Sequence, residues 1–274
     1  MSSGEIDGHT HAWAPASRFE WLNDGPSCVT KLVYTVEDLL EDIERRGSDQ
    51  AVIVGTPIHG PPNPYVLQCV ERYPDTFYGV ITLEYTSPTI EEQIDEYVTR
   101  DRILGVRLYA LEGANWLLDD SMDSFWDAME KVDGRQVQIL TRPESFETLT
   151  AVVDRCPSIE FVIDHLGLPT PEVHSPTTEP YSTLRQLATY DNVHLKVTHS
   201  ASARPYPFRD IHEFIPTTID WFGADRVFWG SDYSYHFKDA TVTETRRFLD
   251  EVETISSHER SYLTGKTLKK LLRE

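Results

Sequence analysis

Short apolar segments recur along the whole chain, and most of them are continuous runs in which apolar and polar residues do not alternate. Continuous β-branched and apolar runs are typical of parallel strands that are covered on both faces. The pattern predicts eight such strands, at residues 5–10, 51–55, 77–83, 103–109, 136–140, 159–164, 193–198 and 226–230.

Segments with helical spacing lie between these strands. Val36, Leu39 and Ile43 repeat at the three- and four-residue intervals of one helix face. Thr35 precedes this segment as a predicted N-cap, and Gly47 follows it where the helix should end. The same spacing predicts further helices within residues 146–153, 211–219 and 263–272.

The alternation of strands and helices predicts parallel βαβ units. Eight strands favour one closed (β/α)8 barrel, the TIM-barrel fold, with residues 1–274 as a single domain. An open doubly wound sheet is the weaker alternative, because no strand leads into a glycine-rich nucleotide-binding motif. Two proline-rich stretches, 57–64 and 169–180, each follow a strand, and we expect them on the rim where barrel enzymes carry their chemistry.

The composition fits a packed globular protein. Apolar residues make up 39% of the chain, and no apolar run is long enough to span a membrane. Residues 1–5 lack the basic and apolar segments of a signal peptide. Cys28, Cys69 and Cys156 are widely spaced and match neither a zinc-finger motif nor a disulfide framework. We therefore expect a protein of the reducing cytoplasm.

The net charge disfavours some classes of binding partner. The chain has 25 Lys and Arg against 45 Asp and Glu, which gives a formal charge of −20. Such a surface disfavours nucleic acid and anionic membranes as partners, so we expect only a small-molecule substrate. The acidic residues are spread along the chain, and only seven basic residues are lysine, as in halophile-type surfaces. The sequence leaves open whether the chain is a monomer or a homo-oligomer.

Two histidines at the end of the first strand are the first candidate for chemistry. His9 and His11 are two residues apart, so in a strand they point to the same side. At the carboxyl end of a barrel strand that side is the mouth of the barrel. Together they could hold one divalent ion or one anionic substrate, whereas the plainer alternative is a structural pair of hydrogen-bonded histidines.

Two further polar residues end other predicted strands. His165 follows the apolar run of the sixth strand, and Asp232 follows the eighth. A buried histidine is costly without a partner, and a carboxylate at a barrel mouth can accept a proton from water or bind a metal. Each alone is more often a hydrogen-bonded core residue. Together with His9 and His11 they predict an active site.

This combination resembles the amidohydrolase superfamily (amidohydrolase-2 type), in particular its lactonase branch, which includes fuconolactonase and 2-pyrone-4,6-dicarboxylate lactonase. FVIDHLG and WGSD are the more specific motifs, and GVR is weak by itself. The matching segments, in order along nearly the whole chain, are DGHTHAW (7–13), FEWL (19–22), GVR (105–107), RPE (142–144), FVIDHLGLP (161–169), VHLKV (193–197) and WGSD (229–232).

The resemblance implies hydrolysis by attack of water on a carbonyl group. Asp232 is then the general base, and the histidines at 9, 11 and 165 polarise the carbonyl directly or through a metal. Arg107 is expected to bind a substrate carboxylate or hydroxyl groups, with a structural ion pair as the alternative. Residues with weaker expected roles in substrate binding are Lys196, His199, His236 and Trp13.

The sequence leaves the cofactor open. Many metal-containing relatives carry another histidine on strand five, but here that strand ends in Leu140-Thr141-Arg142. Strand four has no lysine for a bridging carbamate. His9, His11, His165 and Asp232 could still hold one Zn or Mn ion. The alternative is metal-independent catalysis in which the imidazoles stabilise the oxyanion themselves.

The resulting prediction is a hydrolase that acts on a small cyclic ester, a sugar-acid or dicarboxylate lactone. A metal-dependent non-oxidative decarboxylase of an aromatic or unsaturated acid is the alternative. It is less favoured because His165-Leu166-Gly167 leads to Leu168-Pro169 without an acidic residue. A barrel that binds a ligand without catalysis is a third hypothesis, against which the complete set of four residues speaks.

Overall fold

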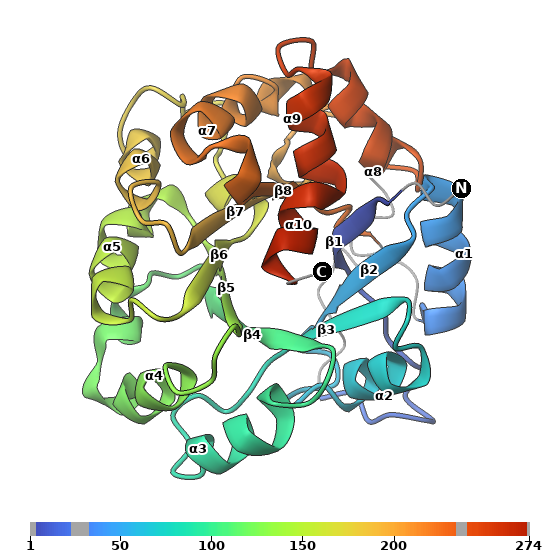
Figure 1. Cartoon of the computed structure of the whole chain (residues 1–274), viewed down its shortest axis with the longest axis vertical. Coiled ribbons are helices and arrows are strands. Elements are labelled where there is room, and N and C mark those ends of the chain that lie inside the picture. The colour runs from blue at the N-terminus through green and yellow to red at the C-terminus, as the bar shows by residue number, and fades with distance from the viewer. Residues whose placement is uncertain (1–3, 23–32, 234–239, 273–274) are drawn as a thin grey trace.

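Eight parallel strands form one sheet in which each strand pairs with the next along the chain. The computed structural model describes residues 4–22, 33–233 and 240–272. Figure 1 shows the strands as a ring with the helices outside. The strands are β1 (Ile6–Thr10), β2 (Gln50–Val54), β3 (Phe77–Ile81), β4 (Ile103–Ala110), β5 (Gln136–Thr141), β6 (Glu160–Ile163), β7 (Val193–Val197) and β8 (Val227–Trp229).

The ring closes between β8 and β1, just beyond the last residue of β8. Thr10 forms a parallel bridge with Tyr233. The backbone N–H of Asp232 donates to the carbonyl of His9 over 2.8 Å, and that of His11 donates to Tyr233 over 2.9 Å. All eight predicted strands and the predicted (β/α)8 barrel are therefore confirmed.

Helices connect the strands on the outside. No helix of the described residues is both long and apolar enough to cross a membrane. Short 3-10 turns complete several connections, and π-helical turns follow α3 and α9. The α-helices are α1 (Val36–Arg46), α2 (Pro64–Arg72), α3 (Ile90–Gln93), α4 (Asp123–Met129), α5 (Phe146–Arg155), α6 (Leu184–Leu187), α7 (Phe214–Phe222), α8 (Glu244–Arg247), α9 (Ser257–Ser261) and α10 (Thr267–Leu271).

Helix α1 begins and ends at the residues that the sequence indicated. The Thr35 side chain accepts from the N–H of Asp38, and the Asp38 carboxylate accepts from the N–H of Thr35 over 2.8 Å. This reciprocal capping satisfies two N–H groups at the start of the helix. Gly47 ends the helix at φ 80°, a left-handed conformation that suits glycine.

The apolar core has two parts. The larger part lies between the strands and the surrounding helices and includes the free cysteines Cys69 and Cys156; Cys28 lies outside the described residues. The smaller part fills the barrel below the site and includes Leu268 of α10, with Leu271 and Leu272 packed against it. Figure 1 shows α10 over the centre of the ring. The predicted terminal helix therefore closes the amino-terminal end of the barrel.

An extra residue in β1 decides where its polar side chains point. Asp7 pairs with Ala51, whereas Thr10 pairs with Ile53, so β1 contains a bulge between them. The carboxylate of Asp7 lies 3.1 Å from Arg46 of α1, outside the sheet. His9, two residues later, points into the barrel because the bulge intervenes.

A second bulge, in β4, turns Arg107 into the barrel. Gly79 pairs with Ile103 and Val80 with Gly105, so β4 contains one extra residue. Leu104 packs inside the barrel and Val106 packs against the helices, which leaves Arg107 facing inward. Gly105 adopts φ 152°, and a Cβ there would lie 1.9 Å from the carbonyl oxygen of Gln136. The glycine of the GVR motif therefore has a steric reason.

Replacing this glycine tests its role. We expect Gly105→Ala to lower the free energy of unfolding by at least about 2 kcal/mol, because it combines backbone strain with a clash against β5. Thermal unfolding would register this as a fall of roughly 4–8 °C in Tm. Gly113→Ala is the matched control, since Gly113 also has a positive φ, 119°, but nothing within 4 Å of its added Cβ. Equal losses in the two variants would contradict the steric argument.

Candidate active site

His9 of β1, His11 just after that strand and Asp232 after β8 form a compact group. His9 Nε2 lies 3.2 Å from His11 Nε2 and 3.4 Å from Asp232 Oδ1. His11 Nε2 lies 3.0 Å from the same carboxylate oxygen. The ring of His165, which follows β6, is centred 4.7 Å from that of His9. The structure thus brings together the four predicted residues, all of them buried; their chemical roles stay predictions.

Two of these residues have an unusual backbone conformation. His165 has φ 54° and Asp232 has φ 52°, both in the left-handed region that most side chains disfavour. Such residues cost roughly 1–3 kcal/mol each and are concentrated at functional sites. His165 lies two residues after the end of β6 and Asp232 three residues after the end of β8, so the turns there direct both side chains toward His9.

The hydrogen-bond partners of His11 define its orientation. Its Nδ1 lies 2.7 Å from the carbonyl oxygen of Val54. A carbonyl only accepts, so Nδ1 carries a hydrogen and donates, and Nε2 faces Asp232. The second carboxylate oxygen of Asp232 accepts a hydrogen bond from Ser200. Both oxygens of the predicted base therefore have defined neighbours.

His165 is held by contacts at both ring nitrogens. Arg107 Nη2 lies 3.1 Å from His165 Nε2, and because arginine has no acceptor, Nε2 must accept. Nδ1 therefore donates to Thr198 Oγ1 over 2.7 Å. Burial lowers the pKa of His165 to about 4, although Asp232 and Asp164 act in the opposite direction. The imidazole is neutral at pH 7.

Asp164, which the sequence reasoning did not select, links the buried charges. Its Oδ1 lies 2.8 Å from Lys196 Nζ, and its Oδ2 accepts from Arg107 Nε over 2.8 Å. Burial alone would raise the pKa of Asp164, but the two cations hold it well below its ordinary value. The carboxylate is therefore ionised and connects β4, β6 and β7.

The expected role of Lys196 needs correction. Its side chain has no exposed surface, and its ammonium group contacts Asp164 at 2.8 Å, Gln138 Oε1 at 2.7 Å and His9 Nδ1 at 2.9 Å. An ammonium group has three hydrogens, so none is left for a substrate oxygen. Lys196 lies beneath the site and does not line it.

Arg107 forms the ion pair that was the alternative to substrate binding. Besides Asp164 and His165, its guanidinium contacts the Tyr109 hydroxyl over 3.2 Å. These contacts use one hydrogen on each of its three nitrogens, and each terminal nitrogen carries a second. Binding of a substrate oxygen by Arg107 therefore stays a prediction.

The remaining substrate-binding expectations have different outcomes. Trp13 has no exposed surface, and its ring packs against Tyr34 at 6.0 Å; its contact with substrate stays a prediction. His199 is also buried and lies against Phe208, with ring centroids 5.2 Å apart, so its contact with substrate stays a prediction. His236 lies outside the described residues.

The sequence contains a signal for the residues that were missed. Gln136 and Gln138 alternate with apolar residues in the fifth strand, and both are buried. Asp164 is a carboxylate directly before His165 in an apolar run. Buried polar groups need partners, so polar residues at inward positions of neighbouring strands are expected to interact. Ser200 has no comparable signal, because its position depends on the turn after β7.

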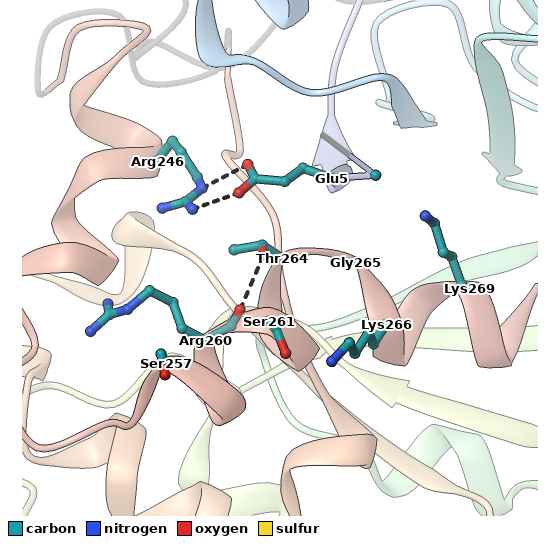
Figure 2. Close-up of a pocket in the computed structure, with 10 residues that line it drawn as sticks. Glu5, Arg246, Ser257, Arg260, Ser261, Thr264, Gly265, Lys266 and Lys269 are labelled. Carbon is teal, nitrogen blue, oxygen red and sulfur yellow. Dashed lines mark hydrogen bonds and ion pairs between the residues drawn. The ribbon is translucent and has the colours of Figure 1, made fainter. Parts of the chain in front are cut away.

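Figure 2 shows a cavity at the opposite end of the barrel, with a volume of about 390 Å³. Arg246 donates two hydrogen bonds to Glu5 there, of 2.7 and 2.9 Å, and so ties the start of β1 to α8. None of the predicted site residues lines this cavity. The Glu5–Arg246 ion pair therefore links the start of β1 to α8 on the face away from the histidines.

Histidine and aspartate side chains that could hold a metal ion are present. Among the described residues, His9, Asp164 and His165 form one group of suitable spacing, and His9, His11 and Asp232 form another. In the second group the nitrogen and oxygen atoms are 3.0–3.4 Å apart, close to the roughly 3.3 Å between ligands of one tetrahedral zinc ion. By spacing alone, this group fits a metal.

The hydrogen bonds around both groups do not fit. The Lys196 ammonium occupies the place of a cation between His9 and Asp164, and Arg107 occupies the lone pair of His165 Nε2. Because Lys196 donates to Nδ1 of His9, the neutral His9 ring carries its hydrogen on Nε2, and a protonated nitrogen is not a ligand. His11 and Asp232 remain, fewer than the three protein ligands of a catalytic zinc site.

Comparison with known proteins identifies the family. The amidohydrolase family profile matches residues 6–250. This chain belongs to the amidohydrolase family. The expected resemblance is thereby confirmed, and the matched region includes all four site residues.

Two curated relatives of this amidohydrolase act on lactones by name. One is the L-fucono-1,5-lactonase of Burkholderia ambifaria, 28% identical over 83% of this chain and 79% of the relative. Another is the 4-sulfomuconolactone hydrolase of Rhizobium radiobacter, 25% identical over 86% of this chain and 77% of the relative.

Solved structures share the fold at lower identity. A probable 2-pyrone-4,6-dicarboxylic acid hydrolase of Acinetobacter baumannii, solved with citric acid, has a TM-score of 0.82 at 19% identity and covers 99% of this chain and 100% of its own. A zinc-bound amidohydrolase of Burkholderia multivorans has a TM-score of 0.81 at 20% identity and covers 98% of this chain and 99% of its own. The manganese-bound 5-carboxyvanillate decarboxylase of Novosphingobium aromaticivorans has a TM-score of 0.71 at 15% identity and covers 98% of this chain and 96% of its own.

The ion pairs of Asp164 predict a stability effect. We expect Asp164→Asn to lower the free energy of unfolding at pH 7 by about 3–5 kcal/mol, because two buried cations lose their carboxylate. Asp123→Asn, which removes the exposed pair with Arg155, is the matched control and should cost less than about 1 kcal/mol. Urea unfolding measures both.

The same variant has a defined pH dependence. The folded-state pKa of Asp164 lies below its ordinary value. The ionised carboxylate therefore adds to the free energy of unfolding at neutral pH. This stabilisation is lost as the pH falls from about 4 toward the folded-state pKa. The difference between wild type and Asp164→Asn should therefore shrink at acid pH. A variant as stable as Asp123→Asn at pH 7 would contradict the central place of Asp164.

Proposed function

We propose that this amidohydrolase opens a small cyclic ester, a sugar-acid or dicarboxylate lactone, by attack of water on the ring carbonyl. The observation that carries the proposal is the buried carboxylate of Asp232, which faces His9 and His11 while Ser200 holds its other oxygen. A fixed carboxylate of this kind can remove a proton from water. The lactone substrates in the names of both curated relatives support the proposal.

The reaction uses groups of this chain only. Asp232 takes a proton from water as the water oxygen bonds to the carbonyl carbon. His9 Nε2–H donates to the carbonyl oxygen as it becomes negative, and one such donor contributes roughly 3–4 kcal/mol. The ring C–O bond then breaks, and the departing ring oxygen takes the proton from Asp232. The product is a hydroxy acid, which releases its carboxyl proton at neutral pH.

The proposal includes no metal ion. The lone pair of His165 is occupied by Arg107, and the cation position between His9 and Asp164 by Lys196. Hydrolysis should therefore persist after treatment with a chelator. The same contacts count against the metal-dependent decarboxylase, which is also the weaker of the structural likenesses, with a TM-score of 0.71.

Removing the proposed base is the sharpest test. Against a panel of sugar-acid and dicarboxylate lactones, Asp232→Asn should reduce kcat by about 10³-fold or more while leaving the circular dichroism spectrum unchanged. Asp225→Asn, on the surface beside Lys270, is the matched control and should retain wild-type kcat. A pH-indicator assay follows ring opening through the acid released.

The panel includes aromatic carboxylic acids, with and without chelator. Release of CO2 from one of them by a protein that opens no lactone would overturn the proposed reaction in favour of decarboxylation. Unchanged lactone turnover in Asp232→Asn would overturn the role of Asp232.

A further inference from the structure

We infer that Lys196 is a positioning residue: its ammonium group fixes His9 as the tautomer protonated on Nε2, which makes His9 the hydrogen-bond donor to the ester carbonyl. The inference rests on the proposed function, since it concerns the same reaction at the same site. It replaces the substrate-binding role that the sequence suggested for Lys196.

The ammonium group has a complete set of acceptors inside the barrel. Nζ lies 2.7 Å from Gln138 Oε1, 2.8 Å from Asp164 Oδ1 and 2.9 Å from His9 Nδ1. The Gln138 side chain is oriented for this, because its amide nitrogen donates to Gln136 Oε1 over 3.1 Å. A group with three donors and three fixed acceptors has little freedom to turn away.

The donor character of Lys196 decides the tautomer of His9. An ammonium group has no lone pair, so His9 Nδ1 must accept, and the single hydrogen of the neutral ring is then on Nε2. Nε2 points to the group formed with His11 and Asp232. Because His11 uses its own Nδ1–H on the Val54 carbonyl, the Nε2–H of His9 is the donor that faces this group, and the proposed reaction places the ester carbonyl oxygen beside it.

Without Lys196 the other tautomer is favoured. Asp164 Oδ1 lies 3.7 Å from His9 Nδ1, and a carboxylate with its ammonium partner removed attracts a hydrogen on that nitrogen. His9 would then present a lone pair on Nε2 beside the carboxylate of Asp232, which places two acceptors where the reaction needs a donor. The expected result is a folded protein with a poorly stabilised transition state.

A spectroscopic experiment tests the tautomer without any substrate. Chelator-treated protein with ¹⁵N-labelled histidine is compared as wild type, Lys196→Met and Lys196→Arg, with His9→Gln used to assign the signals of His9. We expect protonated Nε2 and unprotonated Nδ1 for His9 in wild type and in Lys196→Arg, and a shift to Nδ1–H in Lys196→Met. Protonated Nδ1 in the wild type, or an unchanged tautomer in Lys196→Met, overturns the inference.

Kinetics test the consequence for catalysis. Lys196→Met should lower kcat by about 100-fold or more, since a histidine in the wrong tautomer cost about 10⁴-fold in a serine protease. KM should change by only a few-fold, and Lys196→Arg should restore part of kcat. Lys270→Met, an exposed lysine 64% accessible at its side chain, is the matched control and should keep wild-type kcat. Wild-type kcat in Lys196→Met overturns the inference.

The two proposals fail separately. If the wild type opens no lactone, the proposed function fails, and the histidine spectra still decide whether Lys196 sets the tautomer. If Lys196→Met does not fold, the wild-type spectrum alone decides, because His9 protonated on Nδ1 contradicts the inference.

Discussion

The carboxylate of Asp164, shared by Arg107 and Lys196, is the interaction on which the rest of the site depends. Each cation also donates a hydrogen bond to a histidine: Arg107 donates to His165, and Lys196 donates to His9. The orientation of both rings therefore follows from one ionised group with no access to solvent. Buried charges are costly unless they are paired and hydrogen-bonded, and here the pairing defines which ring nitrogens donate and which accept.

The barrel backbone supplies this arrangement through local irregularities. The bulge in β1 separates Asp7, which pairs with Arg46 of α1, from His9, which faces the interior. The bulge at Gly105 turns Arg107 toward β6. The closing contacts between β1 and β8 include the N–H of Asp232 itself, so the predicted base is placed by the same hydrogen bonds that complete the ring. The backbone hydrogen bonds that close the barrel therefore also position a residue of the site.

The strands, the main helices and the meeting of the four polar residues were predictable because they follow from local patterns. Apolar runs report burial, and a spacing of two places His9 and His11 on one side of a strand. The partners of Lys196 were not predictable in this way, because they depend on the register between strands. Once Ile163 is paired with Leu195, the next residues, Asp164 and Lys196, are neighbours. Bulges leave little trace in the side-chain pattern, and Gly105 in the weak GVR motif was the only sign of one.

The central claim is that water attacks the carbonyl carbon of a cyclic ester at this site. Hydrolysis of an accepted lactone in H₂¹⁸O, followed by mass spectrometry of the product fragments, tests it most directly. We expect one labelled oxygen in the new carboxylate and none in the new hydroxyl group. Label in the hydroxyl group would show that water attacked the alkyl carbon instead, which would contradict the roles assigned to His9 and Asp232.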